Sequence, residues 1–177
     1  ALANGAKFAV VDEPMGNHPN LLLVDNVLAS LQELALHHRK QLPTKIIGIT
    51  GTNGKTTTKE LLHSVLSTKY KVKATEGNLN NHIGVPLSLL KLTGDEDFGI
   101  IEMGANHFGE IAELCEIALP DFGLITNIGK AHLEGFGSAE NIRITKLGLF
   151  ESVVKRHGTL FSNEDSHAIS DFNYSKK

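Results

Sequence analysis

The residues with the clearest chemical role in this sequence lie in a short glycine-rich segment, GTNGKTT, at positions 51–57. Gly51 and Gly54 allow backbone N–H groups to turn inward around a phosphate, and a helix that starts directly afterwards favours an anion at its N-terminus. Lys55 supplies a charge for the β- and γ-phosphates, and the Thr56 hydroxyl can ligate Mg²⁺. The predicted ATP-binding residues are Gly51, Thr52, Asn53, Gly54, Lys55, Thr56 and Thr57.

A carboxylate is expected on the far side of the metal. Glu102 lies near the C-terminal end of the predicted strand FGIIEM, an otherwise apolar segment, at the edge of the sheet where ligands bind. A buried carboxylate without a partner is costly, so a cation or a hydrogen-bond donor should lie beside it. A structural ion pair is the alternative explanation.

Two further loops carry side chains that can reach a ligand. The segments GNLNNHIG (77–84) and MGANHFGE (103–110) are rich in amides and histidine, although asparagines in loops are often only turn formers. Their candidate substrate-binding residues are Asn78, Asn80, Asn81, Asn106 and His107. The segment KAHLEGFGS adds His132, which could be a metal ligand or a general base. A purely structural histidine is the alternative.

Apolar strands alternate with helices from residue 45 onward, which predicts an α/β fold with a mostly parallel sheet and helices on both faces. Loops after the strands should then meet along one edge. The expected strands are 45–50, 71–74, 98–103, 122–127 and 159–163, and the expected helices are 55–68, 85–92, 109–118 and 139–157. In the first of these helices, the stripe formed by Leu61, Leu62, Val65 and Leu66 is expected to face the core.

The first 42 residues have a different pattern. Two short strands, 7–11 and 21–24, precede a helix that starts near Val27 and ends before Pro43. A domain boundary is expected there.

Composition indicates an ordinary globular protein: 177 residues, 41% hydrophobic and 21% charged, with a net charge of −3. This charge gives no reason to expect nucleic acid or a membrane surface as a partner. The single cysteine, Cys115, suits a reducing compartment, and no apolar run approaches the roughly 20 residues that span a bilayer. The N-terminal sequence ALANGAKFAV does not look like a signal peptide. We expect a cytoplasmic protein, cut from a longer chain.

Together these segments resemble the Mur ligase family, and within it the branch that adds D-alanyl-D-alanine to a UDP-N-acetylmuramoyl tripeptide. The family's phosphate loop has the short form TGTNGKT, which explains why Ile49 stands where the general motif has glycine. GNLNNHIGVPLSLL, EMGANHFGEI and AHLEGFGS are similar to that branch, over about residues 45–161. Residues 1–42 more loosely resemble the tail of the N-terminal UDP-sugar-binding domain, so 43–177 would be the central ATP-binding domain, without the C-terminal one.

The resemblance implies site roles residue by residue. Lys55, Glu102, His132 and Lys146 would be catalytic. Two Mg²⁺ ions would be held by Thr56, Glu102, His132 and Lys146, the last if carbamylated, which turns a cation into an anionic ligand. Leu147-Gly148 departs from the Gly-Glu common in relatives, so an ordinary lysine at position 146 is the alternative.

The implied reaction is ATP-dependent, ADP-forming amide ligation in a bacterial cytoplasm. A carboxylate of the UDP-muramoyl peptide attacks the γ-phosphate, and the amine of D-Ala-D-Ala then attacks the resulting acyl phosphate. None of the three arginines lies in a ligand-edge loop, so this chain alone is expected to show no turnover. A folylpolyglutamate-type or other Mur-type ligase, another nucleotide hydrolase or kinase, and a nucleotide-binding module without ligase chemistry remain alternatives. The third residue of the tripeptide and the oligomeric state stay open.

Overall fold

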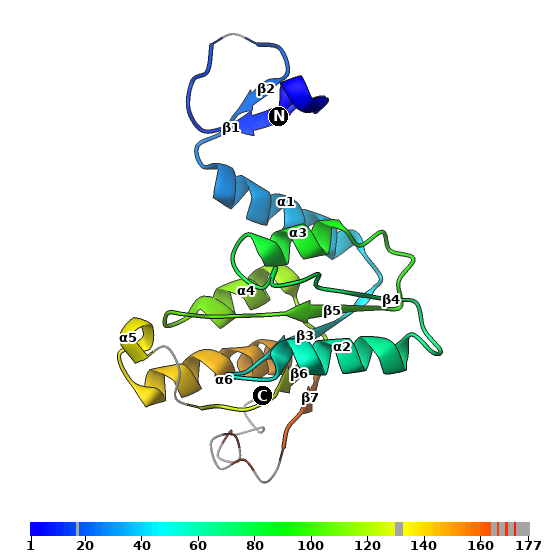
Figure 1. The fold of residues 1–177 in the computed structure, drawn as a ribbon, viewed down its shortest axis with the longest axis vertical. Helices are drawn as coiled ribbons and strands as arrows, with labels where there is room; N and C mark the ends of the chain where they lie inside the picture. Colours follow the sequence, from blue (N-terminus) through cyan, green and yellow to red (C-terminus); the bar gives the residue numbers. More distant parts are fainter. Residues whose placement is uncertain (17, 130–132, 164–165, 167–168, 170–171, 173–177) are drawn as a thin grey trace.

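The structure, a computed structural model, describes all residues except 17, 130–132, 164–165, 167–168, 170–171 and 173–177. Its larger part is a five-stranded sheet flanked by helices, and a small two-stranded sheet stands apart at the N-terminal end, joined to the larger part by helix α1 (Figure 1). Among the described helices, none is long and apolar enough to cross a membrane.

The N-terminal part contains a 3₁₀ turn (Leu2–Asn4), β1 (Ala9–Val11), β2 (Leu21–Leu23) and α1 (Val27–Gln41). The larger part contains β3 (Lys45–Thr50), α2 (Lys55–Leu66), β4 (Val72–Ala74), α3 (Gly84–Leu90), β5 (Phe98–Glu102), α4 (Glu110–Ala118), β6 (Phe122–Ile125), α5 (Leu133–Phe136), α6 (Ala139–Lys155) and β7 (Thr159–Phe161). Each expected element is present with slightly different ends, whereas the short helix α5 was not expected.

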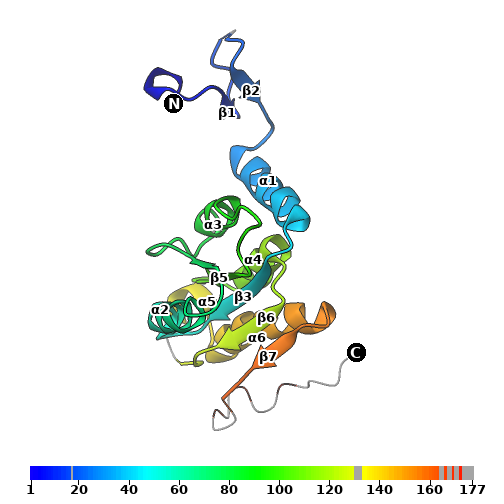
Figure 2. The same ribbon diagram turned by 90° about the vertical axis from the view of Figure 1, so that its right-hand side faces the viewer.

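The strand order of the large sheet is β4-β5-β3-β6-β7, and all of its neighbouring strands pair in parallel. Helix α2 covers one face, while α3, α4 and α6 lie on the other (Figure 2). The predicted α/β architecture, with a parallel sheet and helices on both faces, is therefore confirmed. Because parallel strands end at the same edge, the loops after β3, β4, β5 and β6 come together there.

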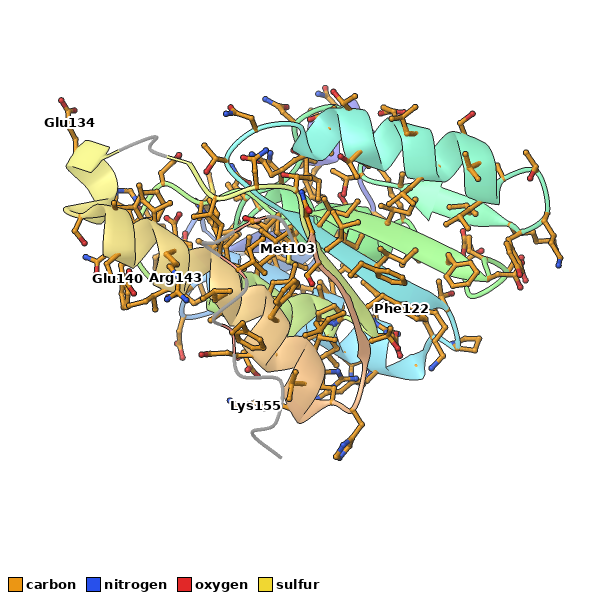
Figure 3. All side chains as sticks on the ribbon, turned by 90° about the horizontal axis from the view of Figure 1, so that it is seen from below. Met103, Phe122, Glu134, Glu140, Arg143 and Lys155 are labelled. Atoms are coloured by element: carbon orange, nitrogen blue, oxygen red, sulfur yellow. The ribbon has the colours of Figure 1, made fainter. Side chains whose placement is uncertain are left out.

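The two faces of the sheet bury separate apolar clusters. The cluster beneath α2 consists of Ile47, Ile49 and Ile100, with Leu62 and Leu66 of the helix packed against it. The larger cluster lies between the sheet and α3, α4 and α6, and includes Ile46, Ile101, Met103, Leu149 and Phe150. Figure 3 shows α6 beneath the sheet, with Met103 in the interior.

The predicted inward stripe of α2 is partly wrong. Leu61 and Val65 are 63% and 67% exposed, whereas Leu62 and Leu66 pack on the sheet. The third position of the inward face is instead Lys59, whose side chain is fully buried.

Helix α1 is fixed to the large sheet by a buried arginine. The Arg39 guanidinium donates to the carbonyl oxygens of Ala118 (2.9 Å) and Leu119 (3.2 Å) and to Asp121 Oδ2 (3.0 Å). The same carboxylate oxygen accepts from the backbone N–H of Ile46 at 2.9 Å. This network joins the end of α1 to the beginnings of β3 and β6, opposite the edge that carries the candidate site.

Candidate nucleotide and metal site

The phosphate loop lies between β3 and α2 and needs glycine at two positions. Gly51 and Gly54 have φ angles of 151° and 78°, a region that other residues rarely adopt. A Cβ atom on Gly51 would lie 1.9 Å from Thr126 Oγ1, so the loop packs too closely against the residues just after β6 for any side chain there. The loop ends where α2 begins, and the free N–H groups of that first turn favour an anion.

Side chains after β6 hold the loop in place. Asn127 makes two bonds to the backbone of Asn53: its Oδ1 accepts from the N–H at 3.1 Å and its Nδ2 donates to the carbonyl at 3.0 Å. Thr126 Oγ1 donates to that same carbonyl at 2.6 Å, and the backbone N–H of Gly129 donates to Thr52 Oγ1 at 2.8 Å. The sequence interpretation missed Asn127, although its position directly after a strand was a usable signal.

Lys55 directs its ammonium group back over the loop. Its Nζ donates to the carbonyl oxygens of Gly51 at 2.9 Å and Thr52 at 3.3 Å. The positive charge therefore lies inside the turn, where the phosphates of a nucleotide would lie. This arrangement fits the predicted role of Lys55.

Glu102 is 1% exposed, and both of its carboxylate oxygens are occupied by neutral donors. Thr56 Oγ1 donates to Oε2 at 2.9 Å, and Asn80 Nδ2 donates to Oε1 at 2.8 Å. The expectation that a donor or cation lies beside Glu102 is thus confirmed. Within the described part of the chain, no lysine, arginine or histidine forms an ion pair with Glu102, so the alternative of a structural ion pair is not supported.

Lys146 lies on α6 and is 4% exposed. Burial, followed by the positive charge of Lys55, lowers the pKa of its ammonium from 10.5 to about 8. With that pKa, roughly a tenth of the amine is neutral near pH 7, against well below a thousandth for an exposed lysine. Lys146 therefore has a larger neutral fraction than an exposed lysine, and it lines the same cleft as the phosphate loop.

The phosphate loop and Lys146 border one cleft of about 890 Å³ at the ligand edge of the sheet. Gly51, Thr52 and Lys55 line it from the phosphate loop, and Lys146 lines it from α6. Its further walls include Asn80, Asn81, His82, Asn106, His107 and, on α1, Leu28 and Gln32. Asn78 is exposed and does not line this cleft.

Several candidate substrate-binding residues also have local structural roles. Asn81 Oδ1 accepts from the backbone N–H of Gly84 at 2.9 Å, at the start of α3. The Glu110 carboxylate accepts from the N–H groups of Asn106 (2.7 Å) and His107 (3.1 Å) and contacts His107 Nδ1 at 2.9 Å. Although burial opposes ionisation, these hydrogen bonds outweigh it and lower the pKa of Glu110. The role of Asn81, Asn106 and His107 in substrate binding remains a prediction.

His132 lies outside the described residues. Among the residues that are described, no group of three or more histidine, cysteine, aspartate or glutamate side chains is positioned to hold a metal. The oxygen atoms that could ligate a metal beside the phosphate loop are the Thr56 hydroxyl and the Glu102 carboxylate. Mg²⁺ commonly binds through one or two protein oxygens plus phosphate and water, so this donor set fits it in the presence of a nucleotide.

Comparison with known proteins gives the family. Residues 49–177 match the Mur ligase middle domain. The UDP-N-acetylmuramoyl-tripeptide–D-alanyl-D-alanine ligase of Bacillus subtilis is 45% identical over 150 residues, which are 85% of this chain and 32% of that relative. The chain thus spans about a third of the length of this relative.

Solved structures agree with this match. The MurF structure from Acinetobacter baumannii superposes with a TM-score of 0.85 at 35% identity, covering 96% of this chain and 38% of that one. The MurF ligase of Thermotoga maritima in complex with ADP has a TM-score of 0.79 at 37% identity, covering 93% and 39% of the two chains. With a family match over most of its length and the predicted fold confirmed, this chain belongs to the Mur ligase family.

Proposed function

We propose that this chain is the nucleotide-binding part of an ATP-dependent, ADP-forming ligase that joins D-Ala-D-Ala to a UDP-N-acetylmuramoyl tripeptide. This reaction belongs to peptidoglycan precursor synthesis in the bacterial cytoplasm. The observation that carries the proposal is that the phosphate loop, Lys146 and Asn80 line one cleft, and that Asn80 bonds the Glu102 carboxylate, which also contacts Thr56 at the start of α2. The names of the similar relatives support the choice of substrates.

The phosphate loop would bind the triphosphate. Backbone N–H groups at the start of α2 and the Lys55 ammonium would donate to the phosphate oxygens, replacing the contacts of Lys55 with Gly51 and Thr52. Charge on the transferred phosphoryl group is thereby stabilised by fixed donors. Asn127 would keep the loop in shape, because it holds the Asn53 backbone at two points.

Thr56 and Glu102 would hold one Mg²⁺, while His132 and a carbamylated Lys146 would hold the second. The metal neutralises the repulsion between the attacking carboxylate and the triphosphate. Asn80 would orient the Glu102 carboxylate through its bond to Oε1. The substrate carboxylate would take the γ-phosphoryl group and release ADP. The amine of D-Ala-D-Ala would then attack the acyl carbon of the acyl phosphate, form the amide bond and release inorganic phosphate.

The low pKa of Lys146 supports its carbamylation, because only the neutral amine reacts with CO₂. In ¹³C-bicarbonate, the chain should show a carbamate carbon resonance that is lost in Lys146→Met. Lys155→Met, at the C-terminal end of α6 (Figure 3), is the matched control and should keep that resonance. A resonance that persists in Lys146→Met would rule out carbamylation of this residue.

We propose two domain parts, 1–42 as the tail of a UDP-sugar-binding domain with its linker helix, and 43–177 as the central ATP-binding domain. The small sheet β1–β2 pairs only within itself, and α1 reaches the large part through Arg39. Leu28 and Gln32 of α1 also border the cleft, so the N-terminal part would contribute to substrate binding.

Calorimetry tests the nucleotide site. The chain should bind Mg-ATP, and Lys55→Ala should bind it about 10- to 100-fold more weakly, since a charge-assisted contact contributes about 1.5–3 kcal/mol. Lys69→Ala, at an exposed lysine just beyond α2, should bind like the wild type. If the folded wild-type chain gives no heat with Mg-ATP, the proposal fails.

Ligase chemistry needs a separate test. This chain alone should release no ADP when both substrates are present, because none of its arginines borders the described cleft. The full-length protein should form a trappable acyl phosphate on the muramoyl peptide. Nucleotide binding without acyl phosphate in the full-length protein would identify a binding module instead.

A further inference from the structure

Lys59 is the one residue of α2 whose side chain is completely buried, and the nucleotide site described above does not use it. Its ammonium donates to the carbonyl oxygen of Thr75 at 2.6 Å and lies 3.5 Å from that of Gly77. It also contacts Glu60 Oε1 at 3.0 Å, although that glutamate is 63% exposed on its side chain. A buried ammonium is costly to desolvate, so these contacts need to be made well.

The carbonyls that Lys59 binds belong to the segment directly after β4. Thr75 is 2% exposed, and its Oγ1 accepts the backbone N–H of Glu102 at 3.0 Å. Thr75 also donates its own N–H to the carbonyl of Ile100 at 2.9 Å. Lys59 therefore contacts the residue that fixes the backbone of Glu102.

The same segment continues to Asn80, which donates to the Glu102 carboxylate. The carbonyl of Asn80 accepts the N–H of Gly104 at 2.7 Å, so Asn80 is joined both to the Glu102 side chain and to the backbone two residues after it. On α2, Thr56 and Lys59 are three residues apart and so lie on one face. Thr56 contacts the Glu102 side chain directly, and Lys59 reaches Glu102 through the 75–80 segment.

We propose that Lys59 is a positioning residue for the metal site: its buried ammonium holds the 75–80 segment, and that segment fixes the backbone and carboxylate of Glu102. The inference rests on the proposed function, because it assumes that Glu102 holds Mg²⁺ with ATP. Lys59 itself touches neither nucleotide nor metal.

Amide hydrogen exchange in the nucleotide-free chain tests the positioning without relying on ligand binding. In Lys59→Met, which keeps the length of the side chain but not its charge, the amides of Glu102 and Gly104 should exchange at least about tenfold faster. The amide of Thr126, which donates to Thr50 on the other side of β3, should be unchanged. Glu60→Gln is the matched control, since it removes only the charge of the exposed partner of Lys59, and it should leave all three amides unchanged.

The second measurement is the affinity for ATP with saturating Mg²⁺ and with a chelator. In the wild type, Mg²⁺ should increase the affinity for ATP. In Lys59→Met, most of this increase should be lost, so that the affinity with Mg²⁺ falls about tenfold or more, while the affinity in the chelator stays near the wild-type value. Should Lys59→Met not fold, Lys59→Gln, which retains a donor but no charge, is measured in the same way.

Selective loss of protection at Glu102 and Gly104 together with loss of the Mg²⁺ effect supports the inference. Unchanged amides, or equal acceleration at Thr126, would overturn it, because Lys59 would then have no special connection to Glu102. Faster exchange with an unchanged Mg²⁺ effect would also overturn it. If the wild-type chain shows no Mg²⁺-dependent ATP binding, the proposed function fails, and the amides alone still decide whether Lys59 holds Glu102.

Discussion

Replacing Lys146 by methionine should stabilise the chain at neutral pH. The folded structure lowers the pKa of this lysine from 10.5 to about 8, mainly by burial and also through the charge of Lys55. A shift of about 2.5 units corresponds to about 3 kcal/mol at 1.36 kcal/mol per unit. Methionine fills a similar volume without a charge, so most of this penalty should be recovered.

The pH dependence follows from the direction of the shift. Below about pH 8 the lysine is protonated in both states, and the full penalty applies. Between about pH 8 and 10.5 the folded chain releases its proton before the unfolded chain does, so the unfolded state binds more protons and stability rises with pH. Above about pH 10.5 the amine is neutral in both states and the penalty is gone.

Urea unfolding of the wild type, Lys146→Met and Lys155→Met in CO₂-free buffer measures this effect. The difference between Lys146→Met and wild type should be about 3 kcal/mol at pH 7 and below about 1 kcal/mol at pH 10. Lys155 is exposed on the last turn of the same helix, so its variant should follow the wild type at every pH. A difference that does not change with pH, or a Lys146→Met chain less stable than wild type at pH 7, would refute the reasoning.

Three further changes test other parts of the structure. Gly51→Ala should fold but bind Mg-ATP at least about tenfold more weakly by calorimetry, because its Cβ would meet Thr126 Oγ1 and its φ angle of 151° suits only glycine; wild-type affinity would contradict the close packing. Arg39→Met should lower the free energy of unfolding by about 3 kcal/mol in urea, because it removes the buried bonds to Asp121 and to the Ala118 and Leu119 carbonyls and leaves Asp121 with the exposed Lys45 as its cation. A change below about 0.5 kcal/mol would show that these contacts are unimportant. Burial raises the pKa of the Cys115 thiol to about 12, so a thiol reagent at pH 8 should react only as fast as the chain unfolds; a rapid reaction in the native state would mean that this thiol is accessible.

Much of this site followed from local sequence, because its chemistry depends on neighbouring residues. Gly51, Gly54 and Lys55 must follow one another closely for a strand, a turn and a helix to surround a phosphate, so their spacing alone predicted the loop. Alternating apolar strands and helices likewise predicted the parallel sheet, since both of its faces are buried. A buried glutamate at the end of such a strand needs a hydrogen-bond donor or a cation beside it, and Glu102 has Thr56 and Asn80 as donors.

Other features depended on which residues meet across the fold. The pattern of α2 could not show that Leu61 is exposed and Lys59 buried, because the sheet beneath the helix selects the inward face. Nor could the sequence show that Asn80, rather than a cation, partners Glu102, since their contact joins two different loops. The lowered pKa of the Lys146 ammonium arises only when folding removes water from it and brings Lys55 nearby. Sequence therefore determined the order of the elements and the types of the reactive groups, whereas the tertiary structure decided their partners and protonation, because desolvation and charge act through space.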